Sequence, residues 1–307
     1  MSNVLVTVII PAYNHERFIE ESIRSVINQD YCNIELVIIN DGSKDRTHDI
    51  ILSMMDECQH RFSRFEYIDK NNEGVAVTLN KGIEWSNAKY ITALASDDLM
   101  KPNKVSLLLS VLANTGSDVG FVYADADFIN DNNELVGLDK RGNYCSINEG
   151  YISFIEYYTR KRSDIILGVN SFTYEVLLKG NFIPAMSVMW KRTALEQVGL
   201  FTPNIIIEDW DLWLKMVRVF KGVYLPSIVA SYRWHENNTV KKSEVKILQA
   251  IDYMLMNQLE ILSISGDKKI LKVITRSLLI NVLRLVRVKK YKFLLRFFDF
   301  NVVKYLF

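Results

Sequence analysis

The sequence contains few cysteines, and the three that it has are Cys32, Cys58 and Cys145. Because their number is odd and no two stand in a Cys-x-x-Cys spacing, we expect neither a disulfide framework nor a zinc site. No run approaches the roughly 20 apolar residues that a membrane-spanning helix needs. The first residues lack a basic segment and a small-residue cleavage site, so we expect no secretory signal and a cytoplasmic location.

Neither sign of charge is in excess over the whole chain, which has 37 basic and 36 acidic side chains. The distribution is uneven, because residues 268–307 hold 11 Lys or Arg and a single acid, Asp299. The net charge is therefore +10 in that tail and −9 over residues 1–267. A negative main body excludes nucleic acid as an expected partner.

The basic tail also contains many Leu, Ile, Val and Phe residues. A basic amphipathic helix with aromatic residues can lie in the interface of an anionic membrane. The alternative is a set of helices that pack on the main domain and keep a basic outer face. We predict that residues 268–307 associate peripherally with the cytoplasmic face of a membrane.

Hydrophobic residues make up 49% of the chain, enough for one large α/β domain with an extension. The first third alternates between continuous apolar runs and segments with apolar residues at helical spacing. The predicted strands are 4–11, 34–40, 64–69 and 89–96, and the predicted helices between them are 15–29, 45–58 and 74–86. This order predicts a mostly parallel sheet that is covered on both faces. Later residues predict a hairpin around 131–133, helical pieces and a return strand at 222–235.

Polar groups follow each of the four predicted strands. Parallel strands present their carboxyl ends at one edge of the sheet, and ligands of such sheets bind there. The groups are Pro11-Ala12-Tyr13-Asn14, Asn40-Asp41-Gly42-Ser43, Asn71-Asn72-Glu73-Gly74 and Ser96-Asp97-Asp98. The sequence therefore predicts a ligand site that is built from these four turns.

Two adjacent carboxylates, Asp97 and Asp98, end the fourth strand. Like charges at one edge repel unless a proton or a cation lies between them. Oxygen ligands of this kind suit Mg²⁺ or Mn²⁺, which also bind phosphate oxygens. The alternative for Asp98 is a helix N-cap before residues 104–112.

The order of these motifs resembles that of the family 2 glycosyltransferases with a GT-A fold. The motifs are P-A-Y-N, N-D-G-S-K-D, N-x-G-x-A with N-K-G, S-D-D, and E-D-W-D-L-W-L, and they extend over residues 4–235. The resemblance implies a GT-A (Rossmann-like) α/β fold with a mostly parallel central sheet flanked by helices. It places the catalytic domain at 1–240, with a nucleotide-binding half at 1–120 and an acceptor-side half at 121–240, before a basic helical C-terminal extension at 241–307.

The resemblance also implies an activity. Family 2 enzymes are inverting transferases that use a nucleotide sugar and a divalent metal, here Mn²⁺ or Mg²⁺. We expect a UDP-sugar donor and a glycan or lipid-linked acceptor in the synthesis of a surface polysaccharide. The alternative activity on the same fold is that of a sugar nucleotidyltransferase. Such an enzyme would need a glycine-rich loop after the first strand, and the segment PAYNHERF at that place has no glycine.

Matching positions assign the nucleotide side of the site. The resemblance puts Pro11, Ala12, Tyr13 and Glu16 around the uridine and Asp41 on the base. A carboxylate that accepts the imide N–H of a pyrimidine makes a charge-assisted bond, and Gly42 allows close approach. The alternative for this motif is a polar turn. Three further residues are expected on the ribose and phosphate side; they are Asn72, Gly74 and Lys81. The alternative for Lys81 is a solvated side chain, as is common for a lysine on a helix face.

The metal motif departs from the family pattern. The family has D-x-D-D where this chain has Ala95-Ser96-Asp97-Asp98. Asp97 matches the metal ligand, and Ser96 is a weaker substitute for the acid that bonds the ribose. The substitution at Ala95 also leaves open a catalytically inactive nucleotide-sugar-binding or scaffold subunit.

A second acidic cluster begins the segment EDWDLWLKMV. Asp209 matches the family's catalytic base, which takes the proton of the acceptor hydroxyl. Glu208 and Asp211 are expected to orient this base or to bind the acceptor. The alternative is that acids simply favour a helix start, at about 0.3–1 kcal/mol each.

His235 follows the return strand, in SYRWHENN. In related enzymes a histidine at this place approaches the diphosphate or its metal, so we predict it as a second metal ligand; the alternative is a structural histidine. The segment 181–201 resembles the acceptor-side wall of the family, and we expect most of its Met and Trp residues to be core.

Overall fold

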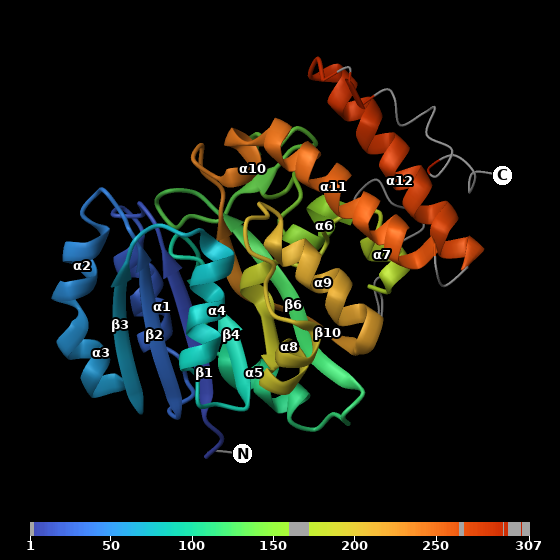
Figure 1. The fold of residues 1–307 in the computed structure, drawn as a ribbon. Coiled ribbons are helices and arrows are strands. Elements are labelled where there is room, and N and C mark those ends of the chain that lie inside the picture. The colour runs from blue at the N-terminus through green and yellow to red at the C-terminus, as the bar shows by residue number, and fades with distance from the viewer. Residues whose placement is uncertain (1–2, 160–171, 264–266, 291, 294–301, 303–307) are drawn as a thin grey trace.

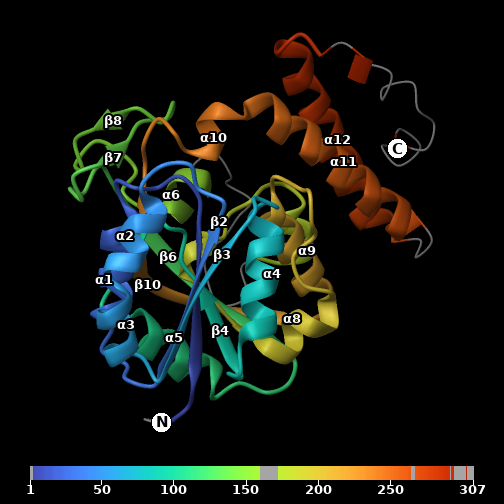
Figure 2. The same ribbon diagram turned by 60° about the vertical axis from the view of Figure 1, so that its left-hand side comes forward.

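The protein is represented by a computed structural model that describes residues 3–159, 172–263, 267–290, 292–293 and 302. An eight-stranded sheet crosses it in the order β3-β2-β1-β4-β9-β6-β10-β5 (Figures 1 and 2). The predicted strands of the first third are present and pair in parallel. They are β1 (Val6–Ala12), β2 (Ile34–Asp41), β3 (Arg64–Lys70) and β4 (Tyr90–Ala93). The predicted mostly parallel sheet is confirmed.

The other half of the sheet is mixed. β9 (Val188–Lys191) lies between β4 and β6 (Val119–Ile129) and is antiparallel to both. β10 (Lys221–Arg233), the predicted return strand, is parallel to β6, and β5 (Leu99–Met100) is antiparallel to β10. An antiparallel bridge from Ile129 to Leu135 closes the predicted turn around 131–133. A small separate sheet joins β7 (Gly137–Leu138) and β8 (Tyr144–Cys145).

Helices cover both faces of the sheet because the strands bury side chains on both faces. Val8 and Ile10 of β1 belong to one apolar cluster, whereas Ile9 belongs to the other. The first cluster includes residues of α1 (Ile19–Ile27) and α5 (Lys104–Leu112); the second includes residues of α4 (Val75–Trp85), α8 (Arg192–Val198) and α9 (Glu208–Val219). The remaining helices of this part are α2 (Thr47–Ser53), α3 (Met55–Arg61), α6 (Phe154–Thr159), α7 (Tyr174–Leu177) and the 3-10 turn η1 (Ala185–Ser187).

The structure corrects one expectation from the sequence and confirms another. The single helix expected at 45–58 is two helices, α2 and α3, because the chain bends at Met54. The expectation that the Met and Trp residues of 181–201 belong mostly to the core is confirmed, since Met186, Met189 and Trp190 are buried.

The C-terminal region consists of α10 (Thr239–Lys242), α11 (Glu244–Ser263) and α12 (Lys268–Arg287). Both views place α10 and α11 above the end of the sheet where β1 and β2 finish. Leu271, Ile274 and Leu278 of α12 recur at helical spacing and join the same apolar cluster as the sheet and α11. No helix among the described residues is long and apolar enough to cross a membrane. Peripheral membrane association stays a prediction, and much of residues 291–307 lies outside the described part.

Candidate active site

A large cleft, with a volume of about 1880 Å³, opens beyond the carboxyl ends of the strands. Turns from four strands reach it, as the sequence predicted. The predicted site residues that line it are Pro11, Ala12, Tyr13, Asp41, Asn72, Gly74, Ser96, Asp97, Glu208 and Asp209. Glu16, Lys81 and His235 are not among its lining residues.

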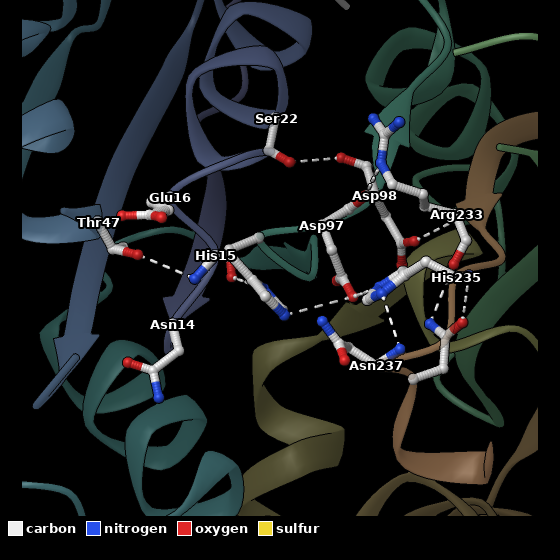
Figure 3. Close-up of polar contacts among 12 residues, drawn as sticks. Asn14, His15, Glu16, Ser22, Thr47, Asp97, Asp98, Arg233, His235 and Asn237 are labelled. Carbon is white, nitrogen blue, oxygen red and sulfur yellow. Dashed lines mark hydrogen bonds and ion pairs between the residues drawn. The ribbon is translucent and has the colours of Figure 1, made fainter. Parts of the chain in front are cut away.

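Asp97 lies in the loop between β4 and β5 and is held by two histidines (Figure 3). Its Oδ2 is 3.1 Å from Nε2 of His235 and 3.6 Å from Nε2 of His15. The backbone N–H of Asn237 donates to Nδ1 of His235 at 3.3 Å, which leaves Nε2 as the nitrogen that donates to Asp97. His15 is fixed in turn by a 2.7 Å hydrogen bond between its Nδ1 and Oγ of Ser96.

This arrangement keeps Asp97 ionised. Burial by itself raises the pKa of Asp97, but the charge of His15 and the hydrogen bond from His235 outweigh it and bring the pKa below its ordinary value. The site therefore presents a carboxylate to the cleft at neutral pH. Ser96, expected as a substitute ligand for the ribose, here supports His15 instead.

Asp98 faces different partners. Its Oδ1 accepts the backbone N–H of Arg233 at 2.9 Å, while Nε of Arg233 donates to the backbone oxygen of Asp97 at 2.7 Å. Burial, followed by the charge of Asp97, raises the pKa of Asp98 well above its ordinary value. Asp98 does not cap the following helix, whose N-cap residue is Asn103. The two neighbouring acids coexist because one is ionised and the other is biased towards its protonated form.

Asp41 shapes the turn that carries Asn72 and Gly74. Its carboxylate accepts the backbone N–H groups of Glu73 and Gly74, each at 2.9 Å, and pairs with Lys70. Burial raises the pKa of Asp41, but these partners outweigh it and lower the pKa below its ordinary value. Gly42 next to it has φ +72°, and a Cβ there would lie 2.8 Å from the backbone nitrogen of Asn72. The N-D-G motif is thus a turn that also faces the cleft, and the contact of Asp41 with a base stays a prediction.

Two residues expected around the nucleotide lie elsewhere. Glu16 accepts the backbone N–H of Arg46 at 2.9 Å and so organises the neighbouring loop. Lys81 is exposed on α4, outside the cleft. Its expected place near the phosphates finds no support in this geometry, because the helix turns the side chain towards solvent.

The second acidic cluster begins α9. Oδ2 of Asp209 accepts a 2.8 Å hydrogen bond from Nδ2 of Asn181, and burial raises the pKa of Asp209. Burial, followed by the charge of Asp209, raises the pKa of Glu208 to about 8. Asp211 does not line the cleft; it accepts from Oγ1 of Thr202 at 2.5 Å and lies 3.5 Å from Nζ of Lys215. The expected acceptor role of Asp211 is therefore not supported, since its carboxylate is engaged on the other side of the helix.

Comparison with known proteins identifies the family of the chain. The family model described as "Glycosyl transferase family 2" matches residues 7–173. The chain belongs to this family. The match ends before α9, so Asp209 and the C-terminal helices lie outside the matched segment.

Relatives of this family 2 glycosyltransferase come from several bacteria. An uncharacterized glycosyltransferase of Rickettsia conorii is 29% identical over 78% of this chain and 36% of its own length. The chain spans 31% to 65% of the length of the five similar Rickettsia proteins. WfgD of Escherichia coli is named a UDP-Glc:alpha-D-GlcNAc-diphosphoundecaprenol beta-1,3-glucosyltransferase; it is 28% identical over 71% of this chain and 72% of its own.

Two solved structures share the fold of this family 2 glycosyltransferase. The mannosyltransferase PcManGT from Pyrobaculum calidifontis, in complex with GDP-Man and Mn²⁺, has a TM-score of 0.60 and 15% identity, covering 93% of this chain and 75% of that one. TarS of S. aureus, in complex with UDP-GlcNAc, has a TM-score of 0.57 and 14% identity, covering 83% and 67%. The likeness shows the GT-A fold, as the sequence predicted.

The carboxylate of Asp97 suits a divalent metal that also binds the phosphate oxygens of a substrate. Within the described residues, no three His, Cys, Asp or Glu side chains are grouped so that they could hold a metal ion. Asp97 supplies one ionised carboxylate at the cleft surface. A single carboxylate fits an ion such as Mg²⁺, which takes its other ligands from substrate phosphates and water. The ligation of a metal by His235 stays a prediction, because its ring here contacts Asp97.

Sequence reasoning missed His15, Asn181 and Arg233. His15 directly follows the P-A-Y-N turn, so its place at the end of a parallel strand was a usable signal. Arg233 lies two residues before His235, and the hydrogen bonds of its buried side chain depend on residues far along the chain. Asn181 carries no signal, because only the fold brings it to Asp209.

Proposed function

We propose that the protein is an inverting glycosyltransferase that transfers a sugar from a UDP-sugar to a lipid-linked saccharide acceptor. The observation that carries this proposal is one cleft lined by both Asp97 and Asp209. Asp97 lies in the loop between β4 and β5 and Asp209 in the first turn of α9. They differ in state, because the pKa of Asp97 is lowered and that of Asp209 is raised. One suits an anion-binding metal, and the other suits a proton acceptor.

The donor side would hold the nucleotide and its metal. The turns with Pro11 to Tyr13, Asp41 and Asn72 form its wall. Asp97 would ligate Mn²⁺ or Mg²⁺, and the ion would neutralise charge on the departing diphosphate. His15 and His235 keep the carboxylate in place and ionised. The complex of PcManGT with Mn²⁺ and that of TarS with UDP-GlcNAc support this choice of ligands by analogy of fold.

The acceptor side would supply the base. Asp209 takes the proton of the acceptor hydroxyl as that oxygen attacks the anomeric carbon, opposite to the leaving nucleotide, which inverts the configuration. Burial and the charge of Asp209 raise the pKa of Glu208 to about 8, which favours a neutral neighbour for Asp209 at neutral pH. The name of WfgD, which describes a sugar joined to a lipid diphosphate, supports the lipid-linked acceptor. Surface polysaccharide synthesis is the process that would use such a product.

Calorimetry with four nucleotides tests the donor. We expect UDP to bind in the presence of Mn²⁺ and to bind at least tenfold more tightly than CMP, because cytosine lacks the imide N–H that Asp41 would accept from uracil. GDP and dTDP keep a ring N–H, so they test the size of the base and the ribose hydroxyl instead. The same protein is then given the matching UDP-sugar and an acceptor of the WfgD type. Binding without any transfer would favour the inactive binding subunit, and failure of all four nucleotides to bind would refute the donor site.

Asn181 would act as a positioning residue for the base. Asn181→Ala removes the hydrogen bond that lowers the pKa of Asp209, so that pKa rises further. Because the base works only when ionised, the acidic limb of the kcat profile should move to higher pH. We expect kcat at neutral pH to fall roughly 10–100-fold, the value of a hydrogen bond to a charged group.

Donor affinity separates this effect from a loss of structure. Asn181→Ala should bind UDP and Mn²⁺ as the wild type does, because Asn181 contacts the base and not the nucleotide turns. The pH profile of transfer and the Kd of UDP are the two measurements. An unchanged acidic limb would mean that Asn181 does not tune Asp209.

A further inference from the structure

The cleft continues beyond Asp209 onto the C-terminal helices. Ser277, Ile280, Asn281 and Arg284 of α12 line it, and their spacing of three, one and three residues puts them on one helical face. Lys246 and Ile247 at the start of α11 line it as well. Both views show α11 beside α12, at the edge of the molecule. The cleft is therefore longer than a nucleotide sugar site that ends at the base.

Asn281 is a buried polar residue in this wall. It is 2% exposed, and its Nδ2 donates to the backbone oxygen of Leu248 at 2.8 Å. Its Oδ1 is buried without a hydrogen-bond partner among the described residues. Buried polar atoms in native proteins are nearly always satisfied, so a helix pair that only packs would favour an apolar side chain here. An acceptor atom beside a cleft suits a donor that arrives with a ligand.

Two cations flank this asparagine. Arg284 is exposed three residues after it, and Lys246 is exposed on α11. Within the described chain neither has a carboxylate partner, whereas Lys269 at the other end of α12 pairs with Glu175 at 2.9 Å. Unpaired cations that line a cleft attract an anion, and phosphate oxygens are the ligands that arginine binds most effectively.

Apolar side chains adjoin the two cations. Ile280 lines the cleft and is 49% exposed, and Ile247 and Ile251 of α11 line it as well. Exposed aliphatic side chains beside unpaired cations match a ligand with an anionic group and a hydrocarbon chain. A nucleoside diphosphate has no such chain, so it does not explain this wall.

From these contacts we infer that the α11–α12 wall binds the diphosphate of a lipid-linked acceptor. Arg284 and Lys246 contact the phosphate oxygens, Asn281 accepts a hydrogen bond from a hydroxyl of the attached sugar, and Ile280 lies against the first part of the lipid chain. The inference rests on the proposed function for its meaning, because the base must act on the sugar that this diphosphate carries. It assigns acceptor recognition to helices that lie outside the segment matched by the family.

The experiment is a titration of decyl diphosphate into the full chain, already saturated with UDP and Mn²⁺ so that the donor site is occupied. We expect one molecule to bind. The double variant Arg284→Gln with Lys246→Gln should weaken its binding at least tenfold, because two charge-assisted contacts are lost. The matched control is Arg276→Gln with Arg287→Gln, which removes the same charge from exposed positions of α12 outside the cleft. The control should change the Kd less than twofold.

Further arms separate the sources of the anion. Asn281→Leu tests the sugar contact: it should leave the binding of decyl diphosphate unchanged but weaken that of a GlcNAc-diphosphate-decyl ligand. Vesicles of phosphatidylglycerol test a plain membrane anchor. If the Arg284 and Lys246 variant loses vesicle binding but keeps decyl diphosphate, the cations serve the membrane and the inference is wrong. Equal losses in both double variants would also overturn it, since the effect would then be diffuse charge.

Failure of UDP to bind would not by itself decide this inference. If UDP gives no heat, the proposed donor is refuted, and decyl diphosphate is titrated into the protein alone. Dependence of that titration on Arg284 and Lys246 would still support an alkyl diphosphate site on this wall. Independence from both would refute it.

Discussion

Asp97→Ala is expected to abolish metal-dependent binding of UDP while the protein remains folded. The variant removes the only ionised carboxylate that the loop after β4 offers to the cleft, so the metal loses its protein ligand. The fold should tolerate the change, because Arg233 bonds the backbone oxygen of Asp97 and not its side chain. Loss of the charge of Asp97 also removes one cause of the raised pKa of Asp98. Calorimetry with UDP, with and without Mn²⁺, measures the effect, and thermal unfolding checks the fold.

Asp98→Asn is the matched control for this variant. Asp98 adjoins Asp97 in the chain, but its raised pKa favours a form that is already neutral, so replacing its acid by an amide changes little charge. The amide oxygen of asparagine can still accept the backbone N–H of Arg233. UDP affinity should therefore stay within severalfold of the wild type. Unchanged UDP affinity in Asp97→Ala would refute the metal assignment, and loss of affinity in Asp98→Asn would then transfer that assignment to Asp98.

The sequence predicted the parallel half of the sheet because its signals are local. β1 and β2 are rich in Val and Ile, and their burial on both faces follows from that composition. β9 was not predicted, because four residues within a long apolar segment carry no sign of their two antiparallel neighbours. Strand pairing at that distance is decided by the assembled core, not by propensity.

The candidate site shows the same division between local signals and contacts made by distant residues. Asp97 and Asp209 could be placed from the order of motifs, since Asp97 lies in the short loop after β4 and Asp209 in the first turn of α9. The partners that set their protonation could not, because His235 lies 138 residues from Asp97 and Asn181 lies 28 residues from Asp209. Lys81 and Asp211 show the opposite case: both matched a motif or a cluster, but neither lines the cleft in this structure.

Asp209→Asn is expected to separate catalysis from donor binding. Without a base, transfer should fall by roughly 10²–10⁴-fold, the usual contribution of general acid–base catalysis. The Kd of UDP with Mn²⁺ should hardly change, because Asp209 is proposed to act on the acceptor. The acidic limb of the wild-type pH profile, where the base becomes protonated as pH falls, should disappear in the variant. The measurements are kcat across pH and calorimetry with UDP.

The control for Asp209→Asn is Asp211→Asn, which neutralises an acid in the same helical turn. Asp211 bonds Thr202 outside the cleft, so this variant should lose some stability and little activity. A mere helix-start role for the acids would make the two variants alike.

Near wild-type transfer by Asp209→Asn would move the base to Glu208. That residue is the natural successor, because the charge of Asp209 is one cause of its raised pKa of about 8, and removing this charge lets Glu208 ionise more readily at neutral pH. Combining Asp209→Asn with Glu208→Gln would then remove the remaining transfer, whereas no further loss in the double variant would exclude both acids as the base.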